Sequence, residues 1–150
     1  MDHIDKDILM KLQNNAKLQT KEIASSVNLS LTPTYERIRK LEQNNIITSY
    51  VALVDRTKIG KHIVAFCQIS LTQHSKTLGE NFRKSIQEMN EVMECYKVSG
   101  NYDFLIKVVV NNVADLHTFI NDKLSTVEGI STMHNALVLE EVKRETAYTV

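Results

Sequence analysis

The sequence predicts an α+β fold in two parts, three short helices followed by a β-α-β-β-α-β unit. Apolar residues recur at helical spacing through the first 45 residues. From residue 63 onward, strand-length runs rich in β-branched residues alternate with two further helical stripes. Between these parts, residues 55–61 contain Gly60 and mark a hinge. We therefore place one domain at 1–60 and the other at 61–150.

The first two helices are predicted to be short and amphipathic. The first follows Asp2, which is placed to cap it, ends near residues 14–15, and carries one apolar stripe: Ile4, Ile8, Leu9 and Leu12. Thr20 is placed to cap a second helix of two turns, whose inner positions are Ile23, Ala24 and Val27. Asn28 follows where the chain must turn.

A third helix is predicted to begin between Ser30 and Pro33, because proline suits a first helical turn. Its spacing places Ile38 and Leu41 in the core. The opposite side is polar and basic, with Thr32, Glu36, Arg39, Lys40 and Gln43, flanked by Tyr35 and Arg37. Two short helices joined by a turn, the second with a bare polar face, form the helix-turn-helix pattern. A plain three-helix bundle with a solvated charged face is the alternative.

Segment 46–55 is rich in β-branched residues and predicts a strand or wing leading out of the helices. Further strands are predicted at 63–71, 92–98, 104–110 and 131–139. Ser75 caps a helix that buries Leu78, Phe82, Ile86 and Met89. Asn112 opens another, ended by Gly129, that buries Val113, Leu116, Ile120, Leu124 and Val127. The charged C-terminal tail adds an edge strand or stays loose.

This order of elements predicts a four-stranded antiparallel sheet with both helices on one face. Both faces of the strands are apolar, since Val64 and Phe66 point to one face and Ala65 and Ile69 to the other. Two helices cover only one face, and each large side chain left in water forgoes roughly 1.5–3 kcal/mol. We therefore expect a second copy of the chain to cover the other face in a two-fold dimer.

The composition is that of a folded protein without a membrane span. The 150 residues are 43% hydrophobic and 24% charged, near the globular average. No apolar run reaches the ~18 residues of a membrane helix, and the N-terminus lacks the pattern of a signal peptide. Cys67 and Cys95 lack a CxxC spacing, which favours two reduced, packed thiols over a disulfide. We expect a cytoplasmic location.

The net charge is zero, with a slight basic excess in the first part. Residues 1–60 carry nine Lys/Arg against seven Asp/Glu, and residues 61–150 carry nine against eleven. This balance permits a nucleic-acid contact without establishing one. The five histidines never occur at metal-ligand spacing, and HExxH, GxSxG and phosphate-loop motifs are absent. We therefore expect no catalytic residues, no metal and no cofactor.

The turn between the second and third strands of the sheet has the chemistry of half an amino-acid site. Gly100 permits close backbone approach, its neighbouring N–H groups are suited to a carboxylate, and Asp103 is suited to an ammonium group. An ordinary hairpin turn, in which Asn and Asp side chains cap the backbone, is the alternative.

Along almost its whole length the chain resembles the Lrp/AsnC family of transcription regulators. The matching stretches are DHIDKDILMKLQNNAK, TKEIASSVNLS, YERIRKLEQNNIITSYVALVD, ECYKVSGNYDFLIKV and VEGISTMHNALVLEEVK. The resemblance implies a DNA-binding helix-turn-helix, winged-helix-like domain and a ferredoxin-like βαββαβ domain that binds small effectors and dimerises, often assembling into tetramers or octamers. Where the family usually has glycine around the recognition helix, this chain has Asn28 and Asn45, which tolerate the left-handed conformation.

Carried over by position, the resemblance assigns DNA contact to Thr32, Tyr35, Glu36, Arg39 and Lys40. It assigns the effector to Gly100, Asn101, Tyr102 and Asp103, with help from Thr132 and His134. The implied partners are double-stranded DNA, further copies of the chain and an amino acid that alters assembly or DNA affinity. Two alternatives stay open: an amino-acid-binding oligomer that regulates an enzyme by protein contact, and a DNA-compacting architectural protein without an effector.

Overall fold

The computed structural model describes residues 1–73 and 75–150 and divides the chain into two compact units. The first unit combines Met1–Leu53 with the C-terminal tail, Val142–Val150, and the second is Val54–Glu141. The predicted division at residue 60 stays a prediction. None of the described helices has the length and apolar character of a membrane-spanning segment.

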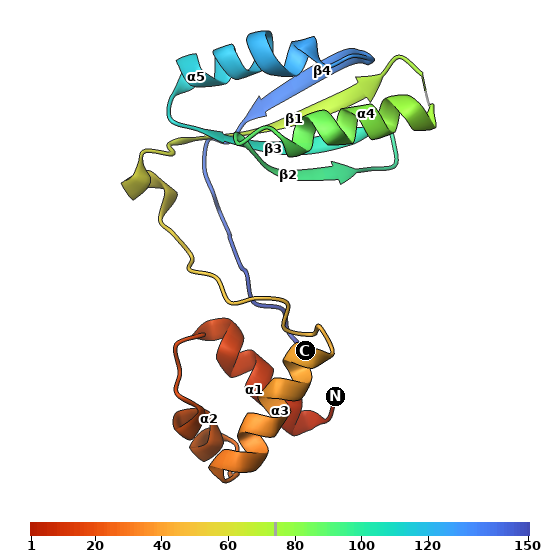
Figure 1. The fold of residues 1–150 in the computed structure, drawn as a ribbon. Helices are drawn as coiled ribbons and strands as arrows, with labels where there is room; N and C mark the ends of the chain where they lie inside the picture. Colours follow the sequence, from red (N-terminus) through yellow and green to blue (C-terminus); the bar gives the residue numbers. More distant parts are fainter. Residues whose placement is uncertain (74) are drawn as a thin grey trace. The chain divides into compact units, whose positions relative to one another are not determined.

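The first unit contains the three predicted helices, α1 (His3–Asn14), α2 (Thr20–Ser26) and α3 (Leu31–Gln43), drawn in red to orange in Figure 1. Their shared core is small, with four buried residues: Ile8, Leu12, Ile23 and Leu41. Ile38 is half-buried at its edge. Thr20 is not the cap of α2, because Gln19 occupies that position and its N–H donates to the Glu22 carboxylate at 2.8 Å.

Segment 46–55 is not a strand. No described residue pairs with it in a β-ladder, and its large side chains Tyr50, Val51 and Leu53 are exposed. β-branched composition favours extended backbone, but a strand also needs a neighbour for its N–H and C=O groups. The chain then makes a 3₁₀ turn, Arg56–Ile59, which Gly60 ends with φ +79°. The C-terminal tail likewise forms no strand.

The second unit has the predicted β-α-β-β-α-β order. It contains β1 (Ile63–Leu71), α4 (Lys76–Gln87), β2 (Val92–Lys97), β3 (Phe104–Val110), α5 (Val113–Thr118) and β4 (Ile130–Leu137). The strands form one antiparallel sheet in the order β2-β3-β1-β4. The two caps predicted in this unit are confirmed, since Ser75 accepts from Leu78 N–H at 3.1 Å and Asn112 from Asp115 N–H at 2.9 Å.

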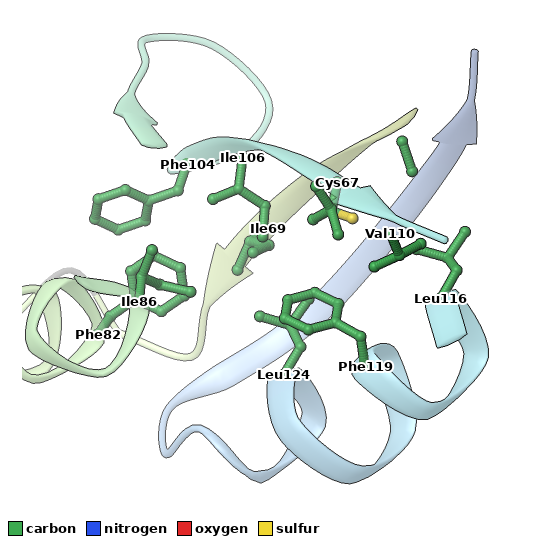
Figure 2. Packing of buried hydrophobic residues seen from close by; sticks show 12 residues of the cluster. Cys67, Ile69, Phe82, Ile86, Phe104, Ile106, Val110, Leu116, Phe119 and Leu124 are labelled. Atoms are coloured by element: carbon green, nitrogen blue, oxygen red, sulfur yellow. The ribbon is translucent and has the colours of Figure 1, made fainter. Parts of the chain in front are cut away.

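The core of this unit lies between one face of the sheet and both helices. Figure 2 shows Phe82 and Ile86 of α4, and Phe119 and Leu124 beyond α5, beneath the strands. The strand residues that meet them lie on one face of the sheet, as Cys67 and Ile69 of β1 do together with Ile106, the partner of Cys67 on β3. The rings of Phe82 and Phe104 lie 4.4 Å apart between centroids. Both helices therefore cover the same face.

The helix after β3 differs from its prediction. α5 passes into a π-helical turn, Phe119–Lys123, and then a 3₁₀ turn, Leu124–Thr126. Val113, predicted to be inside, is 60% exposed, whereas Phe119 is buried. Val113 is the first residue of α5, and the π turn interrupts the 3.6-residue spacing after Thr118, so one regular helical stripe does not describe the buried positions. Leu116 and Leu124 are buried as predicted.

The opposite face of the sheet has no helix over it among the described elements. Phe66, Leu105 and Val109 point to this side and are only half-buried in the single chain. The two cysteines are free thiols, so the disulfide alternative is wrong. Cys67 is packed as predicted, and burial raises its pKa to about 11. Cys95 was predicted to be packed but is exposed, because β2 is an edge strand.

Candidate DNA-binding surface and ligand cavity

α3 turns one side inward and leaves its polar side in solvent. Thr34 and Leu41 are buried, and the Thr34 hydroxyl donates to the carbonyl of Ser30 at 3.0 Å, which anchors the first turn. The side chains predicted to contact DNA are all exposed: Thr32, Tyr35, Glu36, Arg39 and Lys40. Within the described part of the chain, no ion pair engages Glu36, Arg39 or Lys40. Their donors and acceptors are available to a ligand.

Arg37 is used inside the protein. Its Nη1 lies 2.7 Å from a carboxylate oxygen of Asp2 and 2.6 Å from one of Asp5. The same two aspartates form the capping box at the start of α1. The backbone N–H of Asp5 and then the Arg37 guanidinium hold the pKa of Asp2 below its usual value, and the two carboxylates raise the pKa of Arg37. Arg37 therefore ties α3 to the N-terminus of α1.

Two asparagines shape the turns on either side of α3. Asn28 and Asn45 both have φ +54°, in the left-handed region. Asn45 follows the end of α3, where the N–H groups of Ile46 and Ile47 donate hydrogen bonds to the carbonyl of Leu41. The prediction that asparagine takes the place of glycine in both turns is confirmed, because its short polar side chain tolerates positive φ.

The turn between β2 and β3 holds the predicted effector loop. Gly100 has φ +123°, and a Cβ placed there would have no atom within 4 Å, so the backbone is open to a ligand. Asn101 is exposed, and Tyr102 is half-buried. Asp103 closes the turn, since its carbonyl accepts from Val98 N–H at 3.0 Å.

Asp103 also fastens this turn to the end of β1. Its N–H donates to the carbonyl of Ile69 at 2.9 Å, and its carboxylate accepts from Leu71 N–H at 2.8 Å. On the other side of β1, Thr132 pairs with Ser70 and His134 with Gln68. The structure therefore brings Asp103 and Thr132 to the same end of β1, while Gly100 and Asn101 lie at the outer part of the turn.

A cavity of about 410 Å³ opens beside Asp103. Leu71 and Phe104 form apolar wall, and the charged lining comes from two carboxylates and three cations: Glu80, Asp103, Lys76, Arg83 and Lys97. Asp103 alone among the predicted effector residues lines it. Lys76, Glu80 and Arg83 recur at helical spacing along α4, a pattern that in sequence is typical of an ordinary solvated face. Sequence reasoning missed them for this reason.

Comparison with known proteins gives two family matches. Residues 1–48 match the family described as winged helix-turn-helix DNA-binding, and residues 64–148 match the Lrp/AsnC ligand binding domain. The second match alone covers more than half of the chain. The chain belongs to the Lrp/AsnC family.

Relatives of this Lrp/AsnC protein are transcription regulators, not enzymes. The leucine-responsive regulatory proteins of Klebsiella pneumoniae and Escherichia coli are each 31% identical over 144 residues, which is 96% of this chain and 88% of theirs. The chain is accordingly a DNA-binding transcription regulator of the Lrp/AsnC type with a ligand-binding domain.

Solved structures of the family share the fold. An AsnC family transcriptional regulator from Agrobacterium tumefaciens has a TM-score of 0.94 at 33% identity, covering 99% of this chain and 96% of that one. A transcriptional regulator from Neisseria meningitidis, solved as an L-Met complex, has a TM-score of 0.94 at 28% identity with the same coverage. These likenesses establish the helix-turn-helix domain and the four-stranded C-terminal domain.

Proposed function

We propose that this Lrp/AsnC regulator binds a specific DNA sequence as a homo-oligomer and that its C-terminal domain senses an amino acid. The observation that carries the proposal is the exposed polar side of α3, whose Glu36, Arg39 and Lys40 form no ion pair with any residue that the structure describes, while Arg37 beside them is engaged. Arg39 is suited to guanine, Glu36 to cytosine N4 and Lys40 to phosphate, with Thr32 and Tyr35 flanking them.

The cavity beside Asp103 supports an amino acid as the effector. A free amino acid carries one ammonium and one carboxylate, and the lining offers both carboxylates and cations within one space of about 410 Å³. Arg83 and Lys97 suit the ligand's carboxylate, and Glu80 and Asp103 suit its ammonium group. The L-Met complex of the Neisseria regulator supports the same class of ligand.

The uncovered face of the sheet supports self-association. Phe66, Leu105 and Val109 would leave water if a second sheet covered them, at about 25 cal/mol per Å² of apolar surface. Two paired helix-turn-helix units bind two half-sites, so a chain of zero net charge reaches useful affinity through bivalency. An effector then acts by favouring one assembly over another, with a typical coupling of ~1–3 kcal/mol.

The DNA-reading role is tested with two neighbouring variants on α3. Arg39→Ala removes a base contact, so affinity for the cognate site should fall by about 1–3 kcal/mol while affinity for random DNA barely changes. Lys40→Ala removes a phosphate contact, so both affinities should fall together and the salt slope should decrease by about one. Gel shifts of cognate and random DNA over a salt series measure both. An unaltered preference in Arg39→Ala removes that residue from base reading.

The effector site is tested with Asp103→Asn, since Asp103→Ala would also remove the acceptor of the Leu71 N–H bond. The amide keeps an acceptor oxygen and deletes the charge. A thermal-shift screen of the twenty amino acids should find a ligand that stabilises the wild type by about 2.7 kcal/mol at 100 times its Kd, and this shift should vanish in Asp103→Asn. Asp122→Asn, an exposed change elsewhere in the same unit, is the control. An unchanged shift in Asp103→Asn refutes the assignment.

The same measurements separate the two alternative functions. A regulator predicts a preference of ~10³ or more for its site over random DNA. An architectural protein predicts little preference and no ligand shift, and an oligomer that acts on an enzyme predicts a ligand shift without DNA binding.

A further inference from the structure

The C-terminal tail is part of the first compact unit. Val142–Val150 joins Met1–Leu53, although the chain reaches the tail only after β4 of the second unit. The tail has no helix or strand of its own. Its place in the unit must therefore come from contacts with the other residues of that unit.

One side chain makes two hydrogen bonds to the tail. Gln13 of α1 donates from Nε2 to the carbonyl of Tyr148 at 2.9 Å, and its Oε1 accepts from the N–H of the same residue at 2.7 Å. The side-chain amide thus bonds both the N–H and the C=O of one residue, as a partner residue does in a hydrogen-bonded pair of an antiparallel sheet. The Tyr148 side chain is 79% exposed, so the backbone rather than the ring is held.

The tail forms part of the wall of a largely apolar cavity in this unit. The cavity measures about 470 Å³. Leu9 and Leu12 of α1 line one part, segment 46–53 lines another, and Thr146, Tyr148 and Val150 contribute from the tail. Binding an extended peptide through its backbone beside apolar walls is a known mode of peptide recognition. The two bonds between Gln13 and Tyr148 hold the tail beside those walls, of which it forms a part.

We propose that residues 142–150 are a docked strap, held on α1 by Gln13, which links the end of the ligand-binding domain to the helix that supports α3. Gln13 follows Leu12, which packs in the same core cluster as Leu41 of α3. Only residues 138–141 separate β4, the strand of Thr132 and His134, from the tail. The docking of the tail does not depend on any effector. The further proposal that the tail transmits the effector response rests on the function proposed above.

Docking is tested by limited trypsin digestion of the full chain, because Lys143 and Arg144 offer cleavage sites in the tail. Tyr148→Pro deletes the N–H that Gln13 binds, whereas Tyr148→Ala keeps both backbone groups and removes only the exposed ring. Gln13→Leu removes both bonds, and Gln87→Leu makes the same exchange on α4. Cleavage at 143–144, followed by mass spectrometry, tracks the undocked population.

We expect cleavage about tenfold faster in Gln13→Leu and several-fold faster in Tyr148→Pro, with Tyr148→Ala and Gln87→Leu at the wild-type rate. Equal rates in all variants overturn the strap. Acceleration in Tyr148→Ala equal to that in Tyr148→Pro also overturns it, since the ring would then be the anchor. Wild-type protection that falls on dilution overturns the intramolecular strap, because Gln13 would then bind the tail of a second copy.

The regulatory use is tested with the same variants by titrating DNA with and without the amino acid found in the screen. Tyr148→Pro should still show the thermal shift with that amino acid but lose at least half of its effect on DNA affinity, and Tyr148→Ala should keep it. A full effect in a Tyr148→Pro protein with an undocked tail overturns the regulatory link. Failure of the proposed amino-acid response is distinguishable, because no amino acid would then give a thermal shift in the wild type.

Discussion

The two units of this regulator differ in the size of their buried cores. The second unit buries a cluster of twelve residues between a sheet and two helices, whereas the helical unit buries a cluster of four. Small domains bury a smaller share of their surface and are correspondingly marginal. The helical unit adds polar ties, the Arg37 link to Asp2 and Asp5 and the Gln13 link to the tail. Ion pairs also occur in the second unit, as between Lys107 and Glu94, but there they accompany a cluster three times as large.

The largest expected effect comes from one chemical change made in both cores. Ile8 and Ile106 are each 0% exposed, and replacing a buried isoleucine with alanine costs about 2–5 kcal/mol. In the helical unit this loss should exceed the stability available, so α1, α2 and α3 unfold and DNA binding disappears. The second unit should absorb the same loss and stay folded.

Hydrogen exchange followed by mass spectrometry measures both units in each variant. We expect fast exchange across the peptides of 1–45 in Ile8→Ala, with the peptides of β1 and β3 protected as in the wild type. In Ile106→Ala we expect protection to be reduced but retained throughout β1 and β3. A folded helical unit in Ile8→Ala contradicts the view that its core is marginal.

A smaller effect is expected from the ion pairs. Arg37→Met should lower the thermal midpoint of the helical unit, because two carboxylates lose their charge-assisted partner, and added salt should shrink the difference. Lys76→Met removes a pair in the second unit whose atoms are 3.9 Å apart and whose lysine side chain is 90% exposed, so it should change nothing measurable. Circular dichroism melts at low and high salt test both. Equal shifts in the two variants would show that neither the distance nor the exposure of these pairs decides their contribution.

The smallest expected effect is a pH dependence in each unit. Folding lowers the pKa of Asp2, through Asp5 N–H and Arg37, and of Glu91, through Lys123. A lowered carboxyl pKa contributes stability above the unfolded value, about 3.9 for Asp and 4.3 for Glu, and this contribution is lost as pH falls through the folded value. Asp2→Asn should therefore reduce the loss of stability at acid pH in the helical unit only. Glu91→Gln should do the same in the second unit only. Exchange rates between pH 7 and 3 measure it.

Elements whose pattern is local were predictable. The three helices, the four strands and their order follow from periods of 3.6 and 2, and the Ser75 and Asn112 caps from residue type and spacing. The positive φ of Asn28 and Asn45 follows from the left-handed tolerance of asparagine. The exposure of the α3 residues assigned to DNA follows from the helical wheel, because a helix packed on one side leaves the other in water.

Features that depend on distant partners were not predictable. The 46–55 segment has strand-forming residues but no described ladder partner, and the π turn at Phe119–Lys123 changes which residues face the sheet. In the sequence, Arg37 looks like a basic residue on the solvent side of its helix. In the structure it pairs with Asp2 and Asp5, which lie 35 and 32 residues away along the chain. Gln13 and Tyr148 are 135 residues apart.

The amino-acid sequence by itself determined the elements, their order, the two-part organisation and the polar face of α3, because each is set by residues within a few turns or strand lengths of one another. Only the tertiary structure decided that Arg37 contacts the start of α1, that Asp103 fastens the β2–β3 turn to β1, that α4 supplies charges to the cavity beside Asp103, and that the tail contacts α1. The physical reason is that hydrogen bonds and ion pairs act over a few ångströms in space, and separation along the chain says nothing about which groups come that close.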